Sequence, residues 1–231
     1  MDNAKIIKNY LRSLDIDTAP DIINTAVQFL DYLHSQNQKI NLVGTKDKLE
    51  IVNRHFLDSL SILKFKDKFF GSGSKAVDIG SGGGLPGLLL ALFLPSFNWT
   101  LVEKSLKKAE FLNQAIKICR INNIEVIRER AEQLAKKPGY REQYDVVLAR
   151  AVANFRILIE LAIPFCKING KIILYKSRKV FEEIKNHSSM VEELGGKITG
   201  IHQISIEGLN EFRVLLEIKK ISKTPTRYPR N

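Results

Sequence analysis

The most distinctive stretch of the chain is VDIGSGGGLPGLLLAL, residues 77–92, in which five glycines fall within eight residues. An apolar run leads into Asp78, the glycines follow from Gly80 to Gly87, and a second apolar run continues beyond them. Glycine has no Cβ, so such a loop can turn sharply and let a ligand approach the backbone closely. Because the loop follows a predicted strand and opens a predicted helix, it is typical of a nucleotide-binding loop.

Two ligands that contain adenosine could occupy this loop, a dinucleotide such as NAD and S-adenosylmethionine. Gly82, Gly84 and Gly87 satisfy the pattern G-x-G-x-x-G, but this pattern is weak on its own and does not separate the two ligands. Glu103 is predicted at the end of the next strand, where a carboxylate accepts hydrogen bonds from ribose hydroxyls. Since both ligands contain ribose, Glu103 leaves the choice open.

Asp78 favours one of the two ligands by its charge. It lies two residues before Gly80, where NAD would bring a pyrophosphate that a carboxylate repels. S-adenosylmethionine instead has an ammonium and a sulfonium, which a carboxylate attracts. The spacing Asp78-x-Gly80-x-Gly82 therefore predicts binding of S-adenosylmethionine by these residues. The alternative role for Asp78 is to partner the N-terminus of the following helix.

The sequence RAEQL, residues 130–134, follows the third predicted strand, and in such folds this loop meets the adenine. Ala131 would provide a small apolar floor, and Glu132 could reach the amino edge of the base. The alternative is a helix that begins here with an acidic residue in its first turn. The spacing alone does not decide between the two interpretations.

The sequence LARAVANF, residues 148–155, follows the fourth predicted strand, at the sheet edge where a substrate should lie. It lacks the [DN]-P-P-[FY] motif of enzymes that methylate exocyclic amines and the cysteine nucleophile needed to methylate a pyrimidine carbon. The candidate that remains is Arg150, whose guanidinium suits a phosphate or a guanine edge. The alternative for Arg150 is an ion pair with Asp145 or Glu132.

The elements that must position these residues form two patterns. Residues 1–70 are predicted to be helical, since apolar residues recur there at three- and four-residue spacing. Strands are then predicted at 75–80, 98–103, 124–128, 144–149 and 171–176, with helices at 86–94, 105–121, 154–165 and 178–194. Such alternation is typical of a parallel sheet. Residues 197–206 and 211–220 are predicted to form an antiparallel hairpin around a turn at 207–210.

Charge and composition indicate the class of partner. The formal net charge is +11, which favours a polyanion such as nucleic acid. Residues 219–231 contain five basic residues and no acidic one, so this tail could bind RNA or simply be a solvated end. The predicted units are a helical N-terminal cap (1–70), an α/β domain (71–220) and a basic C-terminal tail (221–231).

Several classes of protein are not expected. No stretch is long and apolar enough to span a membrane, and the N-terminus lacks the apolar core of a signal peptide. Cys119 and Cys166 lie far apart, as expected of free thiols in a cytoplasmic protein. The four histidines show no metal-ligand spacing, so we expect no metal site. A monomer is the expected state.

The chain resembles the bacterial 16S rRNA guanine-N7 methyltransferases, also called glucose-inhibited division protein B. The resemblance covers nearly the whole chain, and RHFLDSL together with LPG in the glycine loop is its most specific part. The matching segments are NLVGTKDKLEIVNRHFLDSLSIL (41–63), VDIGSGGGLPGLLLAL (77–92), RAEQL (130–134), YDVVLARAVANF (144–155), GKIILYKS (170–177) and the closing EFRVLLEIKK with TRYPR.

This resemblance implies a fold and a set of site residues. The implied fold is a Rossmann-like class I S-adenosylmethionine-dependent methyltransferase, with a helical N-terminal cap and a seven-stranded, mostly parallel sheet that ends in an antiparallel hairpin. The residues implied to bind the methyl donor are Gly80, Leu85, Ala131, Glu132 and Arg150. Glu103 matches the acidic or polar end of the family's second strand, and Lys176 matches a family lysine that is a candidate to face the RNA.

The implied reaction is methyl transfer to N7 of one guanine, expected to be guanine 527, in 16S rRNA or the small ribosomal subunit, in the bacterial cytoplasm. Guanine N7 has an in-plane lone pair and no proton, so alignment matters more than a general base. No catalytic residue is therefore predicted, and Arg150 and Lys176 are candidates for positioning. The alternatives are an NAD-dependent oxidoreductase and a non-catalytic RNA-binding module with a vestigial cofactor site.

Overall fold

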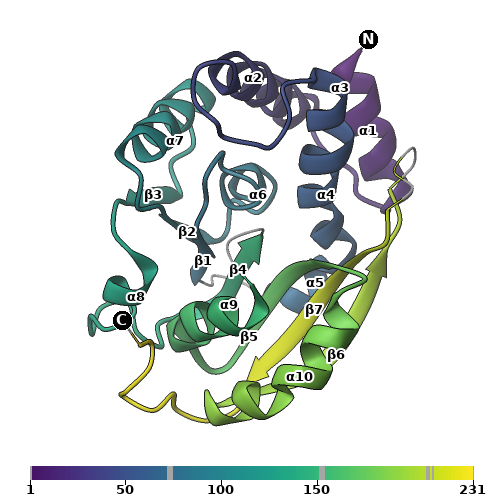
Figure 1. The fold of residues 1–231 in the computed structure, drawn as a ribbon. Helices are drawn as coiled ribbons and strands as arrows, with labels where there is room; N and C mark the ends of the chain where they lie inside the picture. Colours follow the sequence, from purple (N-terminus) through teal and green to yellow (C-terminus); the bar gives the residue numbers. More distant parts are fainter. Residues whose placement is uncertain (1, 72–74, 151–153, 207–208, 210, 231) are drawn as a thin grey trace.

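The computed structural model describes residues 2–71, 75–150, 154–206, 209 and 211–230. This described part contains a seven-stranded sheet with the spatial order β3-β2-β1-β4-β5-β7-β6 (Figure 1). The strands are β1 (Lys75–Ile79), β2 (Asn98–Val102), β3 (Ile124–Ile127), β4 (Tyr144–Arg150), β5 (Cys166–Ser177), β6 (Gly196–Ile204) and β7 (Arg213–Lys220).

The first five strands run parallel, and β7 runs in the opposite direction between β5 and β6. β1 lies between β2 and β4, so Asp78 has Leu101 and Leu148 as its neighbours across the sheet. β7 pairs antiparallel with both β5 and β6. The predicted mostly parallel sheet with an antiparallel last hairpin is thus confirmed. The carboxyl ends of the parallel strands meet at one edge, where ligands of such sheets bind.

Helices cover both faces of the sheet (Figure 1). α8, α9 and α10 bury one apolar cluster against one face, and α1, α2, α4, α6 and α7 bury another against the opposite face. Among the described residues, no helix has the length and apolar character needed to cross a membrane. The α-helices are α1 (Asn3–Ser13), α2 (Pro20–Asn37), α3 (Lys48–Glu50), α4 (Leu57–Leu60), α5 (Lys66–Phe69), α6 (Gly87–Phe93), α7 (Leu106–Cys119), α8 (Ala131–Leu134), α9 (Phe155–Ala162) and α10 (Val180–Glu193).

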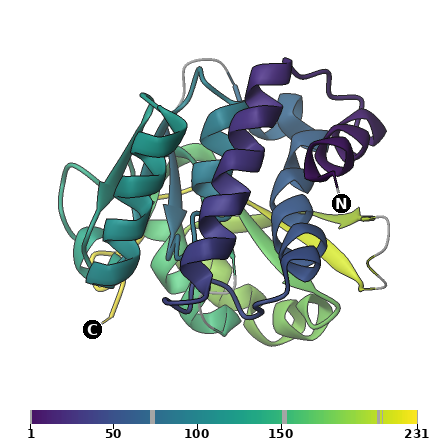
Figure 2. The same cartoon turned by 90° about the horizontal axis from the view of Figure 1, so that it is seen from above.

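The helical cap packs directly onto the α/β part of the chain. α2 begins at Pro20, where the fixed φ of proline suits the first helical position. Figure 2 shows α2 beside α7, and the two helices are in contact through Tyr32 and Phe111, whose rings stack at 5.2 Å. Phe29 of α2 is fully buried in the apolar cluster that also includes residues of α6 and β2. The boundary at residue 70 stays a prediction, but the residues on its two sides share one core.

The segment 52–63, within the region predicted to be helical, is helical but irregular. Residues Ile51–Phe56 form a π-helix, α4 follows, and Ser61–Phe65 form a 3₁₀-helix. The carbonyl of His55 accepts hydrogen bonds from Ser59 Oγ at 2.7 Å and from Arg150 Nη1 at 3.0 Å. Side-chain donors that compete for a helical carbonyl disturb the regular ladder, and π-helical turns are frequent at functional sites.

Two other expectations differ in detail from the structure. β5 was expected to begin at Lys171 but begins at Cys166, because the chain bulges near Asn169, which has a φ of 70°, and then resumes its pairing with β4. The helix expected over 154–165 ends at Ala162 and continues as a 3₁₀-helix, Ile163–Phe165. The turn predicted at 207–210 lies outside the described residues except for Leu209.

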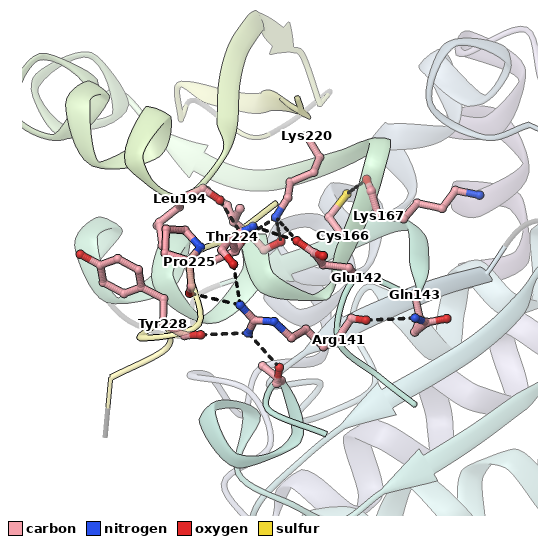
Figure 3. A network of polar contacts seen from close by, with 12 residues as sticks. Arg141, Glu142, Gln143, Cys166, Lys167, Leu194, Lys220, Thr224, Pro225 and Tyr228 are labelled. Atoms are coloured by element: carbon pink, nitrogen blue, oxygen red, sulfur yellow. Dashed lines mark hydrogen bonds and ion pairs between the residues drawn. The ribbon is translucent and has the colours of Figure 1, made fainter. Parts of the chain in front are cut away.

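The C-terminal strap, residues 221–230, packs against the α/β domain. Arg141 holds three of its carbonyls: Nη2 donates to Thr224 at 2.8 Å and to Pro225 at 3.2 Å, and Nη1 donates to Tyr228 at 2.9 Å (Figure 3). Lys220, which is fully buried, pairs with Glu142 at 3.2 Å just before the strap begins. Backbone carbonyls bound in this way fix the course of a chain that has no regular secondary structure.

The two arginines of the strap are already paired within the protein. Arg227 pairs with Glu193 at 2.6 Å and Arg230 with Glu160 at 2.7 Å, while the side chain of Tyr228 between them is buried. The strap is therefore docked on α9 and α10. A contribution of these residues to RNA binding stays a prediction.

Replacing Arg141 tests how the strap is held. Arg141→Leu leaves three strap carbonyls without their charged donor, so we expect the free energy of unfolding to fall by about 2–4 kcal/mol. Urea unfolding measures the loss, and amide hydrogen exchange should show faster exchange in residues 221–230. Arg12→Leu, at an exposed position on α1, is the matched control. An unchanged urea midpoint together with unchanged exchange would contradict this account.

Candidate functional site

The glycine loop between β1 and α6 is shaped by three residues in the left-handed region. Gly80, Gly82 and Gly84 have φ values of 71°, 53° and 78°, which residues with a Cβ rarely adopt. The loop is tied to the end of β2, since Gly82 N–H donates to Glu103 Oε2 at 3.0 Å. The second oxygen, Glu103 Oε1, accepts from the Ser105 N–H at 2.8 Å. Glu103 thus holds the loop in place from its predicted position.

Asp78 lies buried beneath this loop. Its Oδ2 accepts the N–H of Gly87, the first residue of α6, at 3.0 Å. This is the helix-terminus role that the sequence left open as the alternative. Burial raises the pKa of Asp78 to about 7, and the hydrogen bond from Gly87 opposes that rise. A contribution of Asp78 to cofactor binding stays a prediction.

A cavity of 860 Å³ opens beside the glycine loop at the carboxyl edge of the sheet. Five of the residues predicted to bind the cofactor line it: Gly80, Gly82, Glu103, Ala131 and Glu132. They follow three separate strands, β1, β2 and β3, whose carboxyl ends the parallel sheet brings to one edge. The geometry therefore gathers these predicted residues around one space.

Three other predicted cofactor residues lie outside the lining of this cavity. Asp78 and Leu85 are buried below it, and Arg150 lines a different cavity. Their assignment to the methyl donor rested on charge or on the resemblance, and it stays a prediction.

The cavity also has lining residues that sequence reasoning missed. α9 contributes Arg156 and Glu160, α7 contributes Lys108, and the C-terminal strap contributes Arg230. Arg230 donates from Nη2 to Glu160 Oε2 at 2.7 Å, and this hydrogen bond lowers the pKa of Glu160. No pattern in the sequence indicates that the end of the chain returns to this cavity. The helical period of 155–162 could have indicated the face that Arg156 and Glu160 share.

Arg150 at the end of β4 connects the sheet to the cap. Its Nη1 donates to Asp58 Oδ2 at 3.0 Å and to the His55 carbonyl at 3.0 Å, and its Nη2 lies 3.3 Å from His55 Nδ1. The alternative that paired Arg150 with Asp145 or Glu132 was wrong. The π-helix brings the cap to the end of β4, where Asp58 and His55 meet Arg150. No local sequence pattern predicts this contact between distant segments.

Burial sets the protonation of the residues around Arg150. The pKa of His55 is lowered to about 4 by burial and, in second place, by Arg150, so the imidazole is neutral at neutral pH. A neutral ring can accept a hydrogen bond at Nδ1. Burial raises the pKa of Asp58, and the charge of Arg150 opposes that rise.

Comparison with known proteins shows the family. The family model described as rRNA small subunit methyltransferase G matches residues 22–210. A ribosomal RNA small subunit methyltransferase G of Clostridium novyi is 35% identical over 234 residues, which cover 100% of this chain and 96% of that protein. One from Roseiflexus castenholzii is 40% identical and covers 88% of this chain and 86% of that protein. The chain belongs to this family.

Solved structures of other proteins share the fold of this rRNA small subunit methyltransferase G family member. The TYW2 protein of M. jannaschii, in complex with AdoMet, has a TM-score of 0.53 and 19% identity, covering 70% of this chain and 76% of that one. A precorrin-6y C5,15-methyltransferase from Geobacter metallireducens has a TM-score of 0.53 and 13% identity, covering 77% and 90%. At these identities the likeness shows the class I methyltransferase fold.

The family decides between the two ligands that the glycine loop left open. This chain is a methyltransferase that uses S-adenosylmethionine, and the NAD-dependent oxidoreductase was the wrong alternative. The cavity fits this cofactor. Each oxygen of Glu103 accepts one backbone N–H and retains a lone pair for a ribose hydroxyl. Glu129 and Glu132 add polar groups to the lining, and Ile79, Val102 and Ala131 add apolar surface.

Lys176, the other positioning candidate of this methyltransferase, lies at the end of β5. Its ammonium pairs with Glu183 at 2.7 Å and lies 5.2 Å from the centre of the Phe155 ring, and only 10% of its side chain is exposed. Like Arg150, it faces the cavity on the other side of α9 and does not line the cofactor cavity. Its contact with RNA stays a prediction.

The cysteines and possible metal ligands add no chemistry to the described site. Cys119 and Cys166 are free, as expected, and both are buried. Burial raises their pKa to about 11 and about 12, so both thiols are neutral at neutral pH. Within the described ranges, no three His, Cys, Asp or Glu side chains gather closely enough to hold a metal ion.

Removing Glu103 tests the cofactor cavity. Glu103→Ala deletes the acceptor of the Gly82 N–H and the group placed for the ribose, so affinity for S-adenosylmethionine should fall at least about tenfold. Isothermal titration calorimetry measures the affinity, and circular dichroism checks the fold. Glu110→Ala, an exposed change on α7, should bind like the wild type. Wild-type affinity in a folded Glu103→Ala protein would show that the cofactor binds elsewhere.

Proposed function

We propose that this protein transfers a methyl group from S-adenosylmethionine to N7 of a guanine in the 16S rRNA of the small ribosomal subunit. The observation that carries the proposal is the 860 Å³ cavity at the glycine loop, lined by Gly80, Gly82, Glu103, Ala131 and Glu132, in a chain of the rRNA small subunit methyltransferase G family. The net charge of +11 supports an RNA substrate.

The residues around the cavity have separate tasks in this proposal. Glu103 accepts hydrogen bonds from the ribose, Ala131 provides a flat contact for the adenine, and Glu132 reaches its amino edge. When bound, S-adenosylmethionine supplies an electrophilic methyl group on a positively charged sulfur. The glycines leave room for the cofactor close to the backbone of the loop. Each of these residues binds or orients, and none has to move a proton.

Guanine N7 needs little chemical help from the protein. It has a lone pair in the plane of the ring and no proton to lose, so the main requirement is alignment with the methyl group. The lining of the cofactor cavity agrees, since within the described residues it contains no histidine or cysteine. His55, the histidine nearest Arg150, is used as an acceptor for that arginine. We therefore assign Arg150 and Lys176 to positioning of the RNA.

The finer properties of the enzyme follow from the same proposal. We infer a monomer without a metal ion that acts on 16S rRNA or on the assembled small subunit in the bacterial cytoplasm. An RNA-binding module with a vestigial cofactor site is the less favoured function, because the cavity retains the carboxylate of Glu103 and the open glycine loop.

The product of the reaction tests the proposal directly. RNA incubated with the protein and S-adenosylmethionine should contain 7-methylguanosine, whose cationic ring makes the chain cleavable by borohydride followed by aniline. The rate should depend weakly on pH across the neutral range, since no essential base must be deprotonated. Mass spectrometry locates the methyl group. A methyl group on an exocyclic amine or a ribose oxygen would refute N7 as the target and leave the methyltransferase assignment intact.

The raised pKa of Asp78 predicts a proton linked to cofactor binding. With a pKa of about 7 the carboxyl is mostly neutral at pH 6 and mostly ionised at pH 8. A cationic ligand favours the ionised form, so binding at pH 6 has to expel a proton, whereas binding at pH 8 does not. Affinity should therefore rise as the pH passes 7 and then level off.

Calorimetry in two buffers of different ionisation enthalpy measures this proton release. Asp78→Asn cannot ionise at this position. Its proton release on cofactor binding should therefore be smaller than that of the wild type, and its affinity for S-adenosylmethionine should depend less on pH. Asp17→Asn, at an exposed position, is the control and should behave like the wild type. Equal proton release by wild type and Asp78→Asn would separate Asp78 from cofactor binding.

A further inference from the structure

A second cavity at the carboxyl edge of the sheet has no role so far. It has a volume of 190 Å³ and lies among the ends of β4 and β5, the start of β7 and the start of α10. We call it the basic cavity, after the four cationic side chains in its lining: Arg150, Lys176, Lys179 and Arg213. α9 separates it from the cofactor cavity, since Leu158 lines the basic cavity whereas Ile157 and Leu161 line the other.

The charges in the basic cavity are only partly balanced. Its lining contains two carboxylates, which are occupied: Asp58 pairs with Arg150 at 3.0 Å, and Glu183 pairs with Lys176 at 2.7 Å. Arg213 pairs with Glu211 at 2.6 Å, outside the lining. Among the described residues of the lining, cations therefore outnumber carboxylates by four to two.

Two of the donors in this lining remain available. The side chain of Lys179 is exposed, and its ammonium has no ion pair or hydrogen bond with another residue of the described part of the chain. The Nε of Arg213 is buried and likewise has no acceptor among the described residues. A buried N–H without an acceptor is unfavourable by about 1–3 kcal/mol, so a ligand that brings acceptor oxygens would be stabilised here.

We propose that the basic cavity binds a backbone phosphate of the substrate RNA, with Lys179 and Arg213 as its donors. The inference rests on the proposed function and adds the place where the RNA chain is held. A phosphate brings the negative charge that the lining lacks and oxygens that suit both an ammonium and a guanidinium. Phosphate contacts of this kind fix the register of a nucleic acid on a protein.

The chemistry of the reaction argues that this cavity holds a phosphate and not the target base. Methylation at N7 leaves the purine ring with a positive charge. The net positive charge of this lining would oppose the reaction, because like charges repel. On the far side of α9 the same cations attract the RNA backbone and stay apart from the cofactor cavity.

The paired residues give the cavity a fixed shape. Arg150 is held by the cap through Asp58 and His55, and Tyr175 beneath it donates its hydroxyl to the Ser59 carbonyl at 2.9 Å. A site whose walls are already bonded loses little conformational entropy when the phosphate enters. Lys179, the residue that precedes α10, is then free to contact the phosphate.

Lys179 is the residue to change, because its replacement disturbs no contact of the described protein. The probes are small ribosomal subunits from cells that lack the gene, and subunits whose target guanine is replaced by adenine. Lys179→Ala should weaken binding of both probes by the same factor, about three- to tenfold, and reduce the slope of log affinity against log salt by about 1. KM for the unmethylated subunits should rise with kcat unchanged, and the Kd for S-adenosylmethionine should stay constant.

Controls separate a phosphate contact from a general loss of charge. Lys185→Ala removes an exposed lysine two turns further along α10 and should leave both affinities and the salt slope unchanged. Lys179→Arg keeps the charge and should restore most of the affinity. If Lys179→Ala weakens binding only of the subunits that retain the target guanine, the cavity contacts that base and not a phosphate, and the proposal is overturned.

Two further outcomes would also overturn it. If the affinities and the salt slope of Lys179→Ala equal those of the wild type, the cavity is not a phosphate site. Methylation by the wild-type protein would still support the proposed function. The second outcome comes from calorimetry with inorganic phosphate. If phosphate binds through Lys179 but does not compete with the subunits, the cavity is a site for free anions. Failure of the proposed function would give a different result, because the wild-type protein itself would then leave the subunits unmethylated.

Discussion

The close approach of α6 to β1 is the constraint on which the site depends. A Cβ on Gly87 would lie 2.6 Å from the Cβ of Asp78 and 2.5 Å from Leu101 Cδ2, so only glycine lets the helix reach this position. The same contact allows the Gly87 N–H to bond the Asp78 carboxylate. Because α6 is fixed here, the preceding loop has to turn at Gly80, Gly82 and Gly84, and that turn opens the cofactor cavity.

A second linkage joins the cap to the catalytic edge of the sheet. Arg150 reaches from the end of β4 into the π-helix and bonds His55 and Asp58, while Tyr175 from β5 bonds Ser59. The N-terminal helices thus complete the walls of the basic cavity as well as covering the sheet. This explains why a segment outside the α/β repeat contains the sequence RHFLDSL, which is the most specific part of the resemblance.

Features that are encoded locally could be predicted from the sequence. The strands, most helices and the position of Gly80, Gly82 and Glu103 at the cavity follow from periodicity, from glycine and from their place after a strand. The partners of Arg150 and the return of Arg230 to the cavity could not be predicted, because they depend on contacts between distant segments. The irregular helix at Ile51–Phe56 was missed for the same reason, since a side chain from β4 competes for its carbonyl.

The distribution of charge at this edge fits the proposed reaction. Positive charge passes from the sulfur of the methyl donor to the purine ring, so the total charge of the reacting groups stays constant. The described lining of the cofactor cavity has as many carboxylates as cations, so neither sign is in excess and neither side of the transfer is favoured. The carboxylates are Glu103, Glu129, Glu132 and Glu160, and the cations are Lys104, Lys108, Arg156 and Arg230. The excess of cations lies in the basic cavity, where the RNA backbone can use it. The barrier is then lowered mainly by alignment, which is what rigid loops and a fixed backbone contact provide.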